Sequence, residues 1–292
     1  MTYQVVQWAT GAVGKTCLRA VLDHPGLALT GVYVYSERKA GQDAGTIARY
    51  PETGILATRS LAEILALDAD VVIHTARLQL PYSRPDEDIC ALLRSGKNVI
   101  TTTMPDPDFV FTVMGMGSDP ATLDLREGPL AVLFGQLYRE AIAFVCDQMN
   151  VEIEEIQPDH TVVTAPRDLE IAAGRIAAGR IAAGTVAATE WRWHAISAGR
   201  RFLTLSVIWT MDQDLPGYQH RNHWTVEIEG RPDLHLSLDM SDPPGTGLRT
   251  KAGQYVAAGA VINAIPAVVA APPGVFVPPV FAPLTRYGSQ RP

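Results

Sequence analysis

The chain has 292 residues, of which 47% are hydrophobic and 19% charged, and its formal net charge at pH 7 is −7. This composition is that of a folded globular protein rather than a disordered one, and the length predicts two domains. The acidic balance and the lack of a basic run argue against nucleic acid as a partner, because phosphate groups are bound by clustered cations.

The spacing of the cysteines and histidines and the length of the apolar runs argue against a metal site, a redox site and a membrane span. Cys17, Cys90 and Cys146 lack the spacing of a zinc or redox site, so we interpret them as reduced thiols of the core. The histidines show no metal-ligand spacing, and we expect no metal. The first residues enter a strand pattern directly, which predicts a cytoplasmic protein without a secretory signal. The longest apolar run, 256–271, is shorter than a bilayer span and favours a buried helix.

Short β-rich runs alternate with helical ones over the first 103 residues. Apolar periodicity predicts strands at 4–8, 27–35, 69–75 and 98–102, and helices at 13–23, 60–66 and 86–95. The run 71–73 is typical of a strand that is buried on both faces. This alternation predicts an α/β fold with a parallel, doubly wound sheet.

The pattern changes after residue 103, where loops rich in proline and glycine precede a helix predicted at 129–149. Alternating apolar and polar residues then predict strands at 185–193, 202–211, 224–229 and 234–240, with a turn at 230–233 joining the last two into a hairpin. We therefore expect an α+β domain over residues 106–251, built on an antiparallel sheet with one buried face.

A pentapeptide, Ile-Ala-Ala-Gly-Arg, occupies residues 171–175, recurs at 176–180 and begins again at 181. A period of five fits neither a strand nor a straight helix. In a strand it would swap the two faces, so a bulge or loop must absorb the odd residue. We assign no chemistry to this repeat.

The first predicted strand and helix are joined by a glycine-containing turn. In dinucleotide-binding folds, such a turn brings backbone N–H groups against the pyrophosphate, at a helix N-terminus whose dipole favours an anion. Gly11 permits close approach and Gly14 permits close helix–strand packing. Trp8 stands where a further glycine is usual, so a tight turn without a ligand is the alternative. The predicted cofactor-binding residues here are Thr10, Gly11, Ala12, Val13 and Gly14.

The ends of the other strands suggest the remaining cofactor contacts. Ser36, Arg38 and Lys39 follow the second strand, where a carboxylate would favour NAD, so NADP is expected and NAD remains possible because of Glu37. A solvated turn is the alternative. Ligands of open α/β sheets lie at the carboxyl ends of strands. By that rule, further candidate cofactor-binding residues are Thr75, Ala76 and Thr102.

Several motifs, in this order, resemble those of the dihydrodipicolinate reductase-like proteins. They are WATGAVG at 8–14, GVYVYS at 31–36, GKNVITT at 96–102, RDLEIAAG at 167–174, NAIPAV at 263–268 and APPG at 271–274. Within that family the chain is most similar to the 2,4-diaminopentanoate dehydrogenases and native amine dehydrogenases. The resemblance spans nearly the whole chain.

The resemblance implies a Rossmann domain at 1–105, joined by a C-terminal helix that returns at 252–292, and a substrate and dimerisation domain at 106–251. It implies an NAD(P)H-dependent enzyme that reductively aminates a small ketone or aldehyde with ammonia, or reduces an imine. Asn263 is then expected to be buried, with its amide at the nicotinamide end of the cofactor or in a helix–helix hydrogen bond. Asp106, the first carboxylate after the strand at 98–102, is the candidate catalytic residue.

A homodimer is expected on physical grounds as well. The apolar and aromatic residues of the predicted sheet exceed what the helix at 129–149 can cover, and an uncovered apolar face usually marks an interface. The residues concerned are Trp191, Trp193, Val207 and Trp209.

The chain also departs from the family pattern. It lacks the paired-histidine and lysine motif and the Pro-Ser-Gly-Thr-Ala run of true dihydrodipicolinate reductases, which argues against that specific activity. A strand–helix segment that usually follows the strand at 98–102 is missing after Met104. The alternative function is therefore a cofactor-binding sensor or degenerate homologue without turnover.

Overall fold

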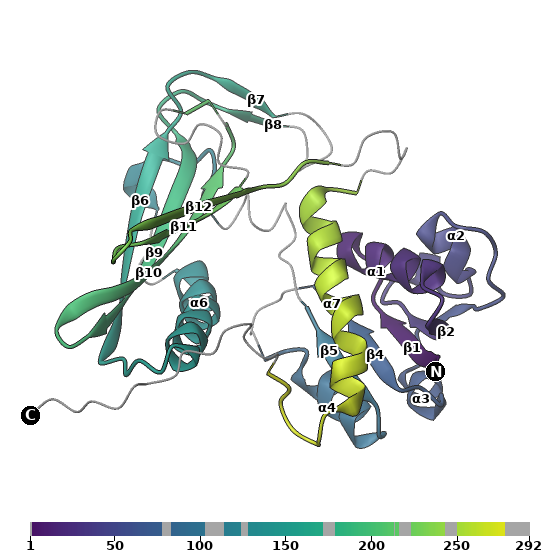
Figure 1. Cartoon of the computed structure of the whole chain (residues 1–292). Coiled ribbons are helices and arrows are strands. Elements are labelled where there is room, and N and C mark those ends of the chain that lie inside the picture. Colours follow the sequence, from purple (N-terminus) through teal and green to yellow (C-terminus); the bar gives the residue numbers. More distant parts are fainter. Residues whose placement is uncertain are drawn as a thin grey trace, which may run out of the picture. The chain divides into compact units, whose positions relative to one another are not determined.

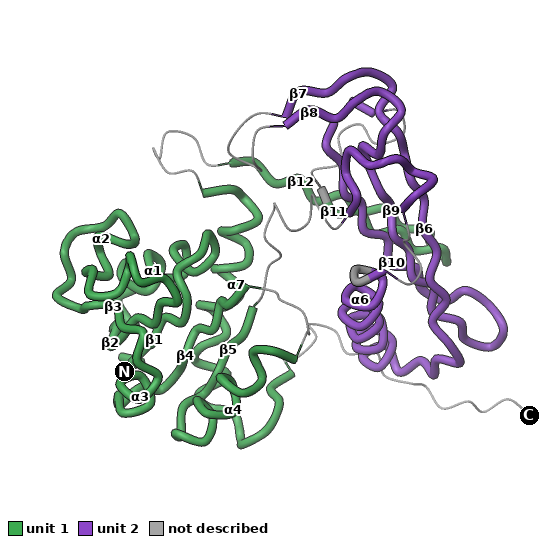
Figure 2. Tube along the Cα trace, turned by 180° about the vertical axis from the view of Figure 1, so that it is seen from behind, with its two compact units in different colours: residues 1–105, 224–278 green, residues 106–223, 279–292 purple. Residues whose placement is uncertain are grey.

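The computed structural model describes residues 2–77, 83–102, 114–123, 128–171, 179–212, 214–215, 223–242 and 250–277. The chain divides into two compact units, one of residues 1–105 and 224–278 and the other of residues 106–223 and 279–292 (Figure 2). We call them unit 1 and unit 2.

Unit 1 contains a five-stranded sheet in the order β3-β2-β1-β4-β5, and every neighbouring pair is parallel. Its strands are β1 (Tyr3–Trp8), β2 (Leu27–Tyr33), β3 (Ala57–Thr58), β4 (Val71–His74) and β5 (Asn98–Thr101). Its helices are α1 (Ala12–Asp23), α2 (Ala44–Ala48), α3 (Leu61–Ala66), α4 (Asp86–Arg94) and α7 (Ala252–Ala270), with a 3-10 helix at Glu37–Lys39. The predicted α/β fold with a doubly wound parallel sheet is confirmed.

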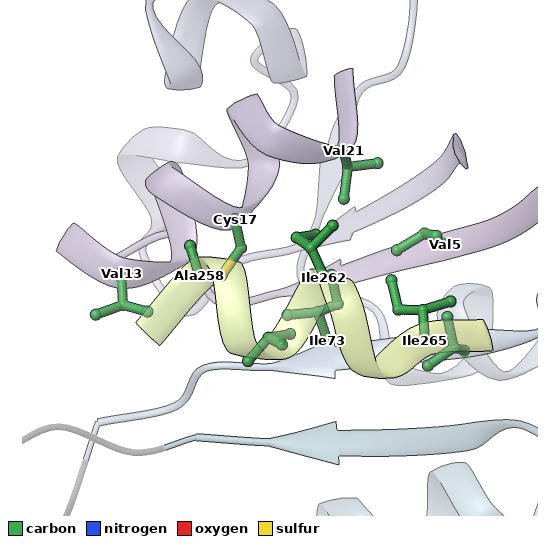
Figure 3. Close-up of a cluster of buried hydrophobic side chains, with 10 residues drawn as sticks. Val5, Val13, Cys17, Val21, Ile73, Ala258, Ile262 and Ile265 are labelled. Carbon is green, nitrogen blue, oxygen red and sulfur yellow. The ribbon is translucent and has the colours of Figure 1, made fainter. Parts of the chain in front are cut away.

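The apolar strands of unit 1 are covered on both faces. Val5 and Ile73 lie in a cluster with α1 and α7, whereas Val6 and Val72 lie in a cluster with α3 and α4. Successive residues of a strand point to opposite faces, so an uninterrupted apolar run serves both clusters. Figure 3 shows the first cluster, in which α7 lies along α1 and the sheet.

Helix α7 meets the length and hydropathy of a membrane span. In unit 1, however, it packs through residues at i, i+3, i+4 and i+7, namely Ala258, Val261, Ile262 and Ile265. Asn263 falls outside that stripe and is exposed. The expectation that Asn263 is buried was wrong, because its position on the helix points it away from the packed face.

Unit 2 contains a three-stranded antiparallel sheet in the order β10-β9-β6. Its strands are β6 (Glu155–Thr164), β9 (Val186–Ser197) and β10 (Arg200–Thr210), and helix α6 (Pro129–Gln148) packs on β9 and β10. The hairpin of β7 (Leu169–Ile171) and β8 (Gly179–Ile181) includes the first residue of the first pentapeptide copy, the last two residues of the second copy, and Ile181, at which the third begins. Residues 172–178 between them lie outside the described residues.

Strands β11 (His223–Ile228) and β12 (Leu234–Asp239) lie at the predicted positions and form a two-stranded sheet of their own (Figure 1). Residues 224–251 fall in unit 1, whereas the sequence placed them in the domain at 106–251. In the part of the chain that the structure describes, the apolar face of this sheet is not buried as predicted. Six apolar side chains on β11 and β12 remain 48–64% exposed, namely Trp224, Val226, Ile228, Leu234, Leu236 and Leu238.

Candidate functional site

The turn between β1 and α1 leaves a helix N-terminus open. Gly11 is the N-cap of α1, and its position carries no side-chain hydrogen bond to the first-turn N–H groups among the described residues. A Cβ on Gly11 would meet no described atom within 4 Å. A Cβ on Gly14 would lie 2.3 Å from the Ala9 carbonyl oxygen and 2.6 Å from Thr75 Oγ1. The two glycines thus fit a pyrophosphate cradle, one allowing approach and the other close packing.

Gln7 and Thr75 hold this turn from the inside of the sheet. Gln7 Nε2 donates to the Ala9 carbonyl at 2.9 Å and to Thr75 Oγ1 at 3.0 Å, and Thr75 Oγ1 donates to the Trp8 carbonyl at 2.9 Å. Ala9 has a positive φ of 69°, which costs an L-residue free energy and persists because these bonds fix it. The Thr75 hydroxyl therefore positions the turn. Sequence reasoning missed Gln7, although a glutamine inside an apolar strand is a recognisable anomaly.

Cations gather at the mouth of the turn. Lys39 Nζ donates to the Thr10 carbonyl at 2.8 Å and to the Thr10 hydroxyl at 3.0 Å. Burial lowers the pKa of Lys39, and the charges of Lys15 and Arg38 lower it further, so both of these cations lie close enough to Lys39 to repel it.

Glu37, the carboxylate nearest to these cations in the sequence, pairs with an arginine outside this group. Glu37 Oε1 accepts from Arg59 Nη1 at 2.7 Å. Ser36 and Arg38 are exposed beside it, and the Ser36 side chain makes no capping bond to the 3-10 helix that follows. The loop after β2 therefore presents hydroxyl and cationic groups, the chemistry that suits a phosphate.

Trp8 does not block the turn. Its ring lies in the cluster with Ile64 and Leu92, on the α3 and α4 side of the sheet. It stacks on Tyr33 with ring centroids 3.8 Å apart, and Trp8 Nε1 donates to the Tyr35 hydroxyl at 2.8 Å. A bulky residue is accepted where a glycine is usual because its side chain points to the sheet face opposite α1.

His74 ends β4 beside this aromatic group. Its Nδ1 lies 3.2 Å from Thr101 Oγ1, its backbone carbonyl accepts from the Thr102 N–H at 2.9 Å, and burial lowers its pKa to about 4. Its side chain is therefore neutral at physiological pH. Ala76 is buried in the cluster that contains Trp8.

The structure gathers most of the predicted cofactor residues at the carboxyl ends of β1, β2, β4 and β5. The predicted residues found there are Thr10, Gly11, Ala12, Val13, Gly14, Ser36, Arg38, Lys39, Thr75, Ala76 and Thr102. Asp106 lies outside the described residues, so its catalytic role stays a prediction. Asn263 lies exposed on α7, and its contact with a cofactor also stays a prediction.

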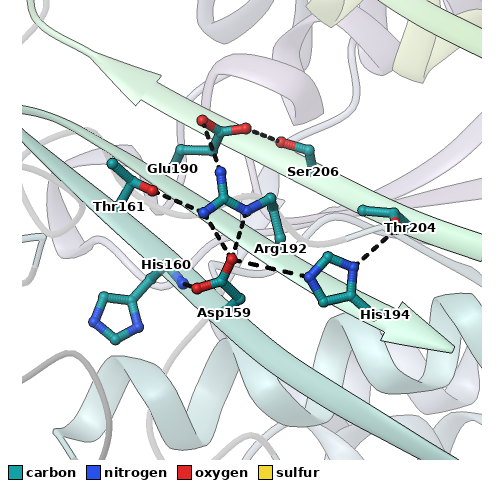
Figure 4. Close-up of polar contacts among 8 residues, drawn as sticks. All are labelled: Asp159, His160, Thr161, Glu190, Arg192, His194, Thr204 and Ser206. Carbon is teal, nitrogen blue, oxygen red and sulfur yellow. Dashed lines mark hydrogen bonds and ion pairs between the residues drawn. The ribbon is translucent and has the colours of Figure 1, made fainter. Parts of the chain in front are cut away.

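A second polar cluster crosses the sheet of unit 2 (Figure 4). Arg192 donates to Asp159 at 2.7 Å and pairs with Glu190 at 3.3 Å, while His194 Nδ1 lies 2.8 Å from Thr204 Oγ1. Asp159 faces Arg192 directly in the register of β6 and β9. These contacts join all three strands and account for their register, since cross-strand pairs stabilise a sheet.

The other face of this sheet is covered by α6. Trp191 and Trp193 are only 4% and 1% exposed, and the Trp193 ring lies 4.7 Å from that of Tyr138 on α6. The ring of Phe134 on α6 stacks on that of Trp209, with the ring centroids 6.1 Å apart. Two of the four side chains from which a dimer was expected, Trp191 and Trp193, are therefore covered within the chain, whereas Val207 and Trp209 on β10 are only partly buried.

Residues 5–104 match the family described as dihydrodipicolinate reductase, N-terminus. An amine dehydrogenase of Streptomyces virginiae is 36% identical over 103 residues, which is 34% of this chain and 28% of that protein. A 4-hydroxy-tetrahydrodipicolinate reductase of Anaeromyxobacter sp. (strain Fw109-5) is 32% identical over 181 residues, which is 60% of this chain and 66% of that protein.

Among solved structures, an amine dehydrogenase from Mycobacterium smegmatis matches 94% of this chain and 95% of its own, with a TM-score of 0.68 and 17% identity. At this identity the likeness establishes the fold alone. Residues 5–104 are thus similar to the N-terminal domain of dihydrodipicolinate reductase, and the resemblance of the chain to the dihydrodipicolinate reductase-like proteins, with the amine dehydrogenases among them, is confirmed.

Proposed function

We propose that the chain is an NAD(P)H-dependent oxidoreductase that reductively aminates a small ketone or aldehyde with ammonia, or reduces an imine. The observation that carries the proposal is the β1–α1 turn, with its uncapped helix N-terminus, the tightly packed Gly14 and the cations around Lys39. The partial sequence match to an amine dehydrogenase supports the choice of reaction. A bound nicotinamide cofactor would supply the hydride, while the N–H groups of the turn would bind its pyrophosphate.

NADP is the preferred cofactor in this proposal. Lys39 donates to uncharged oxygens of Thr10, and Glu37 is engaged by Arg59, so a 2′-phosphate would meet cations and a hydroxyl without a competing carboxylate. Well-formed charge-assisted hydrogen bonds contribute about 1.5–3 kcal/mol each, equivalent to roughly 10- to 150-fold in affinity.

Fluorescence titration with NADPH and NADH tests this preference. NADPH should bind more tightly, and Arg38→Ala should weaken NADPH by about tenfold or more while leaving NADH within about twofold. Arg94→Ala, in the last turn of α4, is the matched control and should change neither affinity. Equal or tighter binding of NADH by the unaltered protein would refute the preference.

Turnover is tested by screening small ketones and aldehydes with ammonia for NADPH oxidation. Asp106→Asn should abolish turnover and leave NADPH binding intact if Asp106 is the catalytic carboxylate. A cofactor-binding sensor without turnover is the second candidate, favoured by the described part of the parallel sheet ending at β5, where a six-stranded Rossmann sheet would continue. Nucleotide binding without oxidation across the screen would favour the sensor.

We also propose a homodimer, formed through the apolar face of β11 and β12. Six side chains at about half exposure offer roughly 500 Å² of apolar surface, a large part of the roughly 800 Å² per partner in a standard interface. His235 Nδ1 and Glu227 Oε1 lie 3.5 Å apart, and both side chains alternate with the apolar residues along their strands. A second copy of the same face would therefore meet it without charge repulsion.

Light scattering at micromolar concentration should give twice the mass of the 31.6 kDa chain. Leu236→Glu should convert the protein to a monomer, because it places a charge within the apolar face. Thr225→Glu, on the alternate side of β11, should not. A monomeric unaltered protein, or dimers that survive Leu236→Glu, would contradict the proposal.

A further inference from the structure

We propose that Tyr35 and Asp88 form the recognition site for the purine base of the dinucleotide, with the Tyr35 ring as a stacking platform and the Asp88 carboxylate as acceptor for the exocyclic amino group of adenine. This inference rests on the proposed function and names the part of the cofactor that this side of the site selects.

Tyr35 is fixed in place although it is exposed. Its hydroxyl accepts from Trp8 Nε1 at 2.8 Å, and its ring meets that of Tyr33 edge-on, with centroids 5.2 Å apart and an angle of 90°. Trp8 is itself held between Tyr33, at 3.8 Å, and His74, at 5.7 Å. Tyr35 is nonetheless 49% exposed. A rigid aromatic ring with a solvent-exposed surface is the element on which nucleic bases stack.

The position of Tyr35 follows the order of groups in a dinucleotide. Pyrophosphate belongs at the α1 N-terminus, and Lys39 reaches that turn from the loop after β2. The adenosine ribose belongs at the end of β2, beside Ser36 and Arg38. Tyr35 directly precedes Ser36 and reaches to Trp8 and Asp88, away from the Lys39 side of the loop. The base, one ribose beyond the phosphates, would therefore meet Tyr35.

Asp88 supplies the polar selectivity. It lies in the first turn of α4, and the Tyr35 hydroxyl approaches its Oδ2 only at 3.5 Å, the limit of a hydrogen bond. Burial raises the pKa of Asp88, but the group remains an acceptor. Adenine carries an amino donor at C6, whereas hypoxanthine carries a carbonyl acceptor there. A carboxylate favours adenine, because a carbonyl oxygen facing it would be repelled.

Titrations with NADPH and with its hypoxanthine analogue, deamino-NADPH, test the site through protein fluorescence. Tyr35→Ala should weaken NADPH about tenfold, as expected for a lost stacking platform, while Tyr35→Phe should stay within about threefold. The affinity for nicotinamide mononucleotide, which lacks the base, should not change in either variant. Circular dichroism and melting temperature show that each variant is folded.

Asp88→Asn gives the sharper readout, because an amide can donate to the hypoxanthine carbonyl as well as accept from adenine. The unaltered protein should prefer NADPH by about tenfold or more, and Asp88→Asn should bring the ratio close to one. Asp23→Asn is the matched control, since Asp23 accepts from a tyrosine hydroxyl, that of Tyr50, at 2.7 Å.

The possible failures are distinguishable. If NADPH binds but neither Tyr35→Ala nor Asp88→Asn has its expected effect, the purine site is refuted and the proposed function stands. If the unaltered protein binds no nucleotide, the proposed function fails and this inference fails with it.

Discussion

Gly14→Ala is the substitution for which the structure gives the firmest expectation. The added Cβ would lie 2.3 Å from the Ala9 carbonyl oxygen, against 3.4 Å or more for an ordinary contact, so α1 must move about 1 Å from β1. Overpacking of this kind costs about 1–3 kcal/mol. Weakening the hydrogen bond that the Ala9 carbonyl accepts from Gln7 adds about 1 kcal/mol. The free energy of unfolding should fall by about 2–4 kcal/mol, measured by urea denaturation.

The same variant should lose nucleotide affinity, because the first-turn N–H groups move with the helix. Gly11→Ala separates binding from stability, since a Cβ there meets no described atom within 4 Å and the backbone φ of −69° suits alanine. It should leave the free energy of unfolding within about 1 kcal/mol and still weaken NADPH at least tenfold. Unchanged stability in Gly14→Ala would refute the packing argument. Unchanged NADPH affinity in Gly11→Ala would show that phosphate does not bind at this turn.

Further predictions concern His74, Ala9 and Gln7. The pKa of His74 is about 4 in the folded chain against 6.5 when unperturbed, so the unfolded chain binds the extra proton between these values. Stability should fall by up to about 3 kcal/mol as pH drops from 6.5 to 4, and His74→Gln should flatten that slope in urea titrations. Ala9→Gly should raise the free energy of unfolding by up to about 1 kcal/mol, because glycine adopts the positive φ of 69° freely; a loss above 1 kcal/mol would contradict the strain. Gln7→Leu should destabilise the chain by about 1–3 kcal/mol, because it removes the amide that donates to the buried Ala9 carbonyl. A rise in melting temperature measured by calorimetry would contradict this.

Much of unit 1 is predictable from the sequence. Strands β1, β4 and β5 and helices α1, α3 and α4 lie where apolar periodicity places them, because burial on both faces of a parallel sheet leaves a strong pattern. Strand β3 and helix α2, with 2 and 5 residues, are too short to show a period. Strand β6 carries few apolar residues and Pro158, which an edge strand tolerates but which hides its alternation.

The candidate site divides in the same way. The spacing of the glycines identifies Gly11 and Gly14, because a turn constrains residues that lie close together in the sequence. The bonds from Lys39 to Thr10 and the contact between Tyr35 and Trp8 join residues 29 and 27 positions apart, so only the fold reveals them. The prediction that all three cysteines are core thiols was correct for Cys17 and Cys146, which are buried, and wrong for Cys90, which is exposed.

The packing of α7 has a consequence for the order in which the chain can fold during synthesis. The surface of α1 that carries Val13, Cys17 and Val21 is completed by Val261 and Ile265, which a ribosome adds more than 200 residues later. Until then, an emerging N-terminal half would hold an unfinished apolar surface next to its phosphate turn. The nucleotide site should therefore mature only after the α+β unit has been synthesised, and a chain cut before residue 252 should aggregate or recruit chaperones rather than bind cofactor.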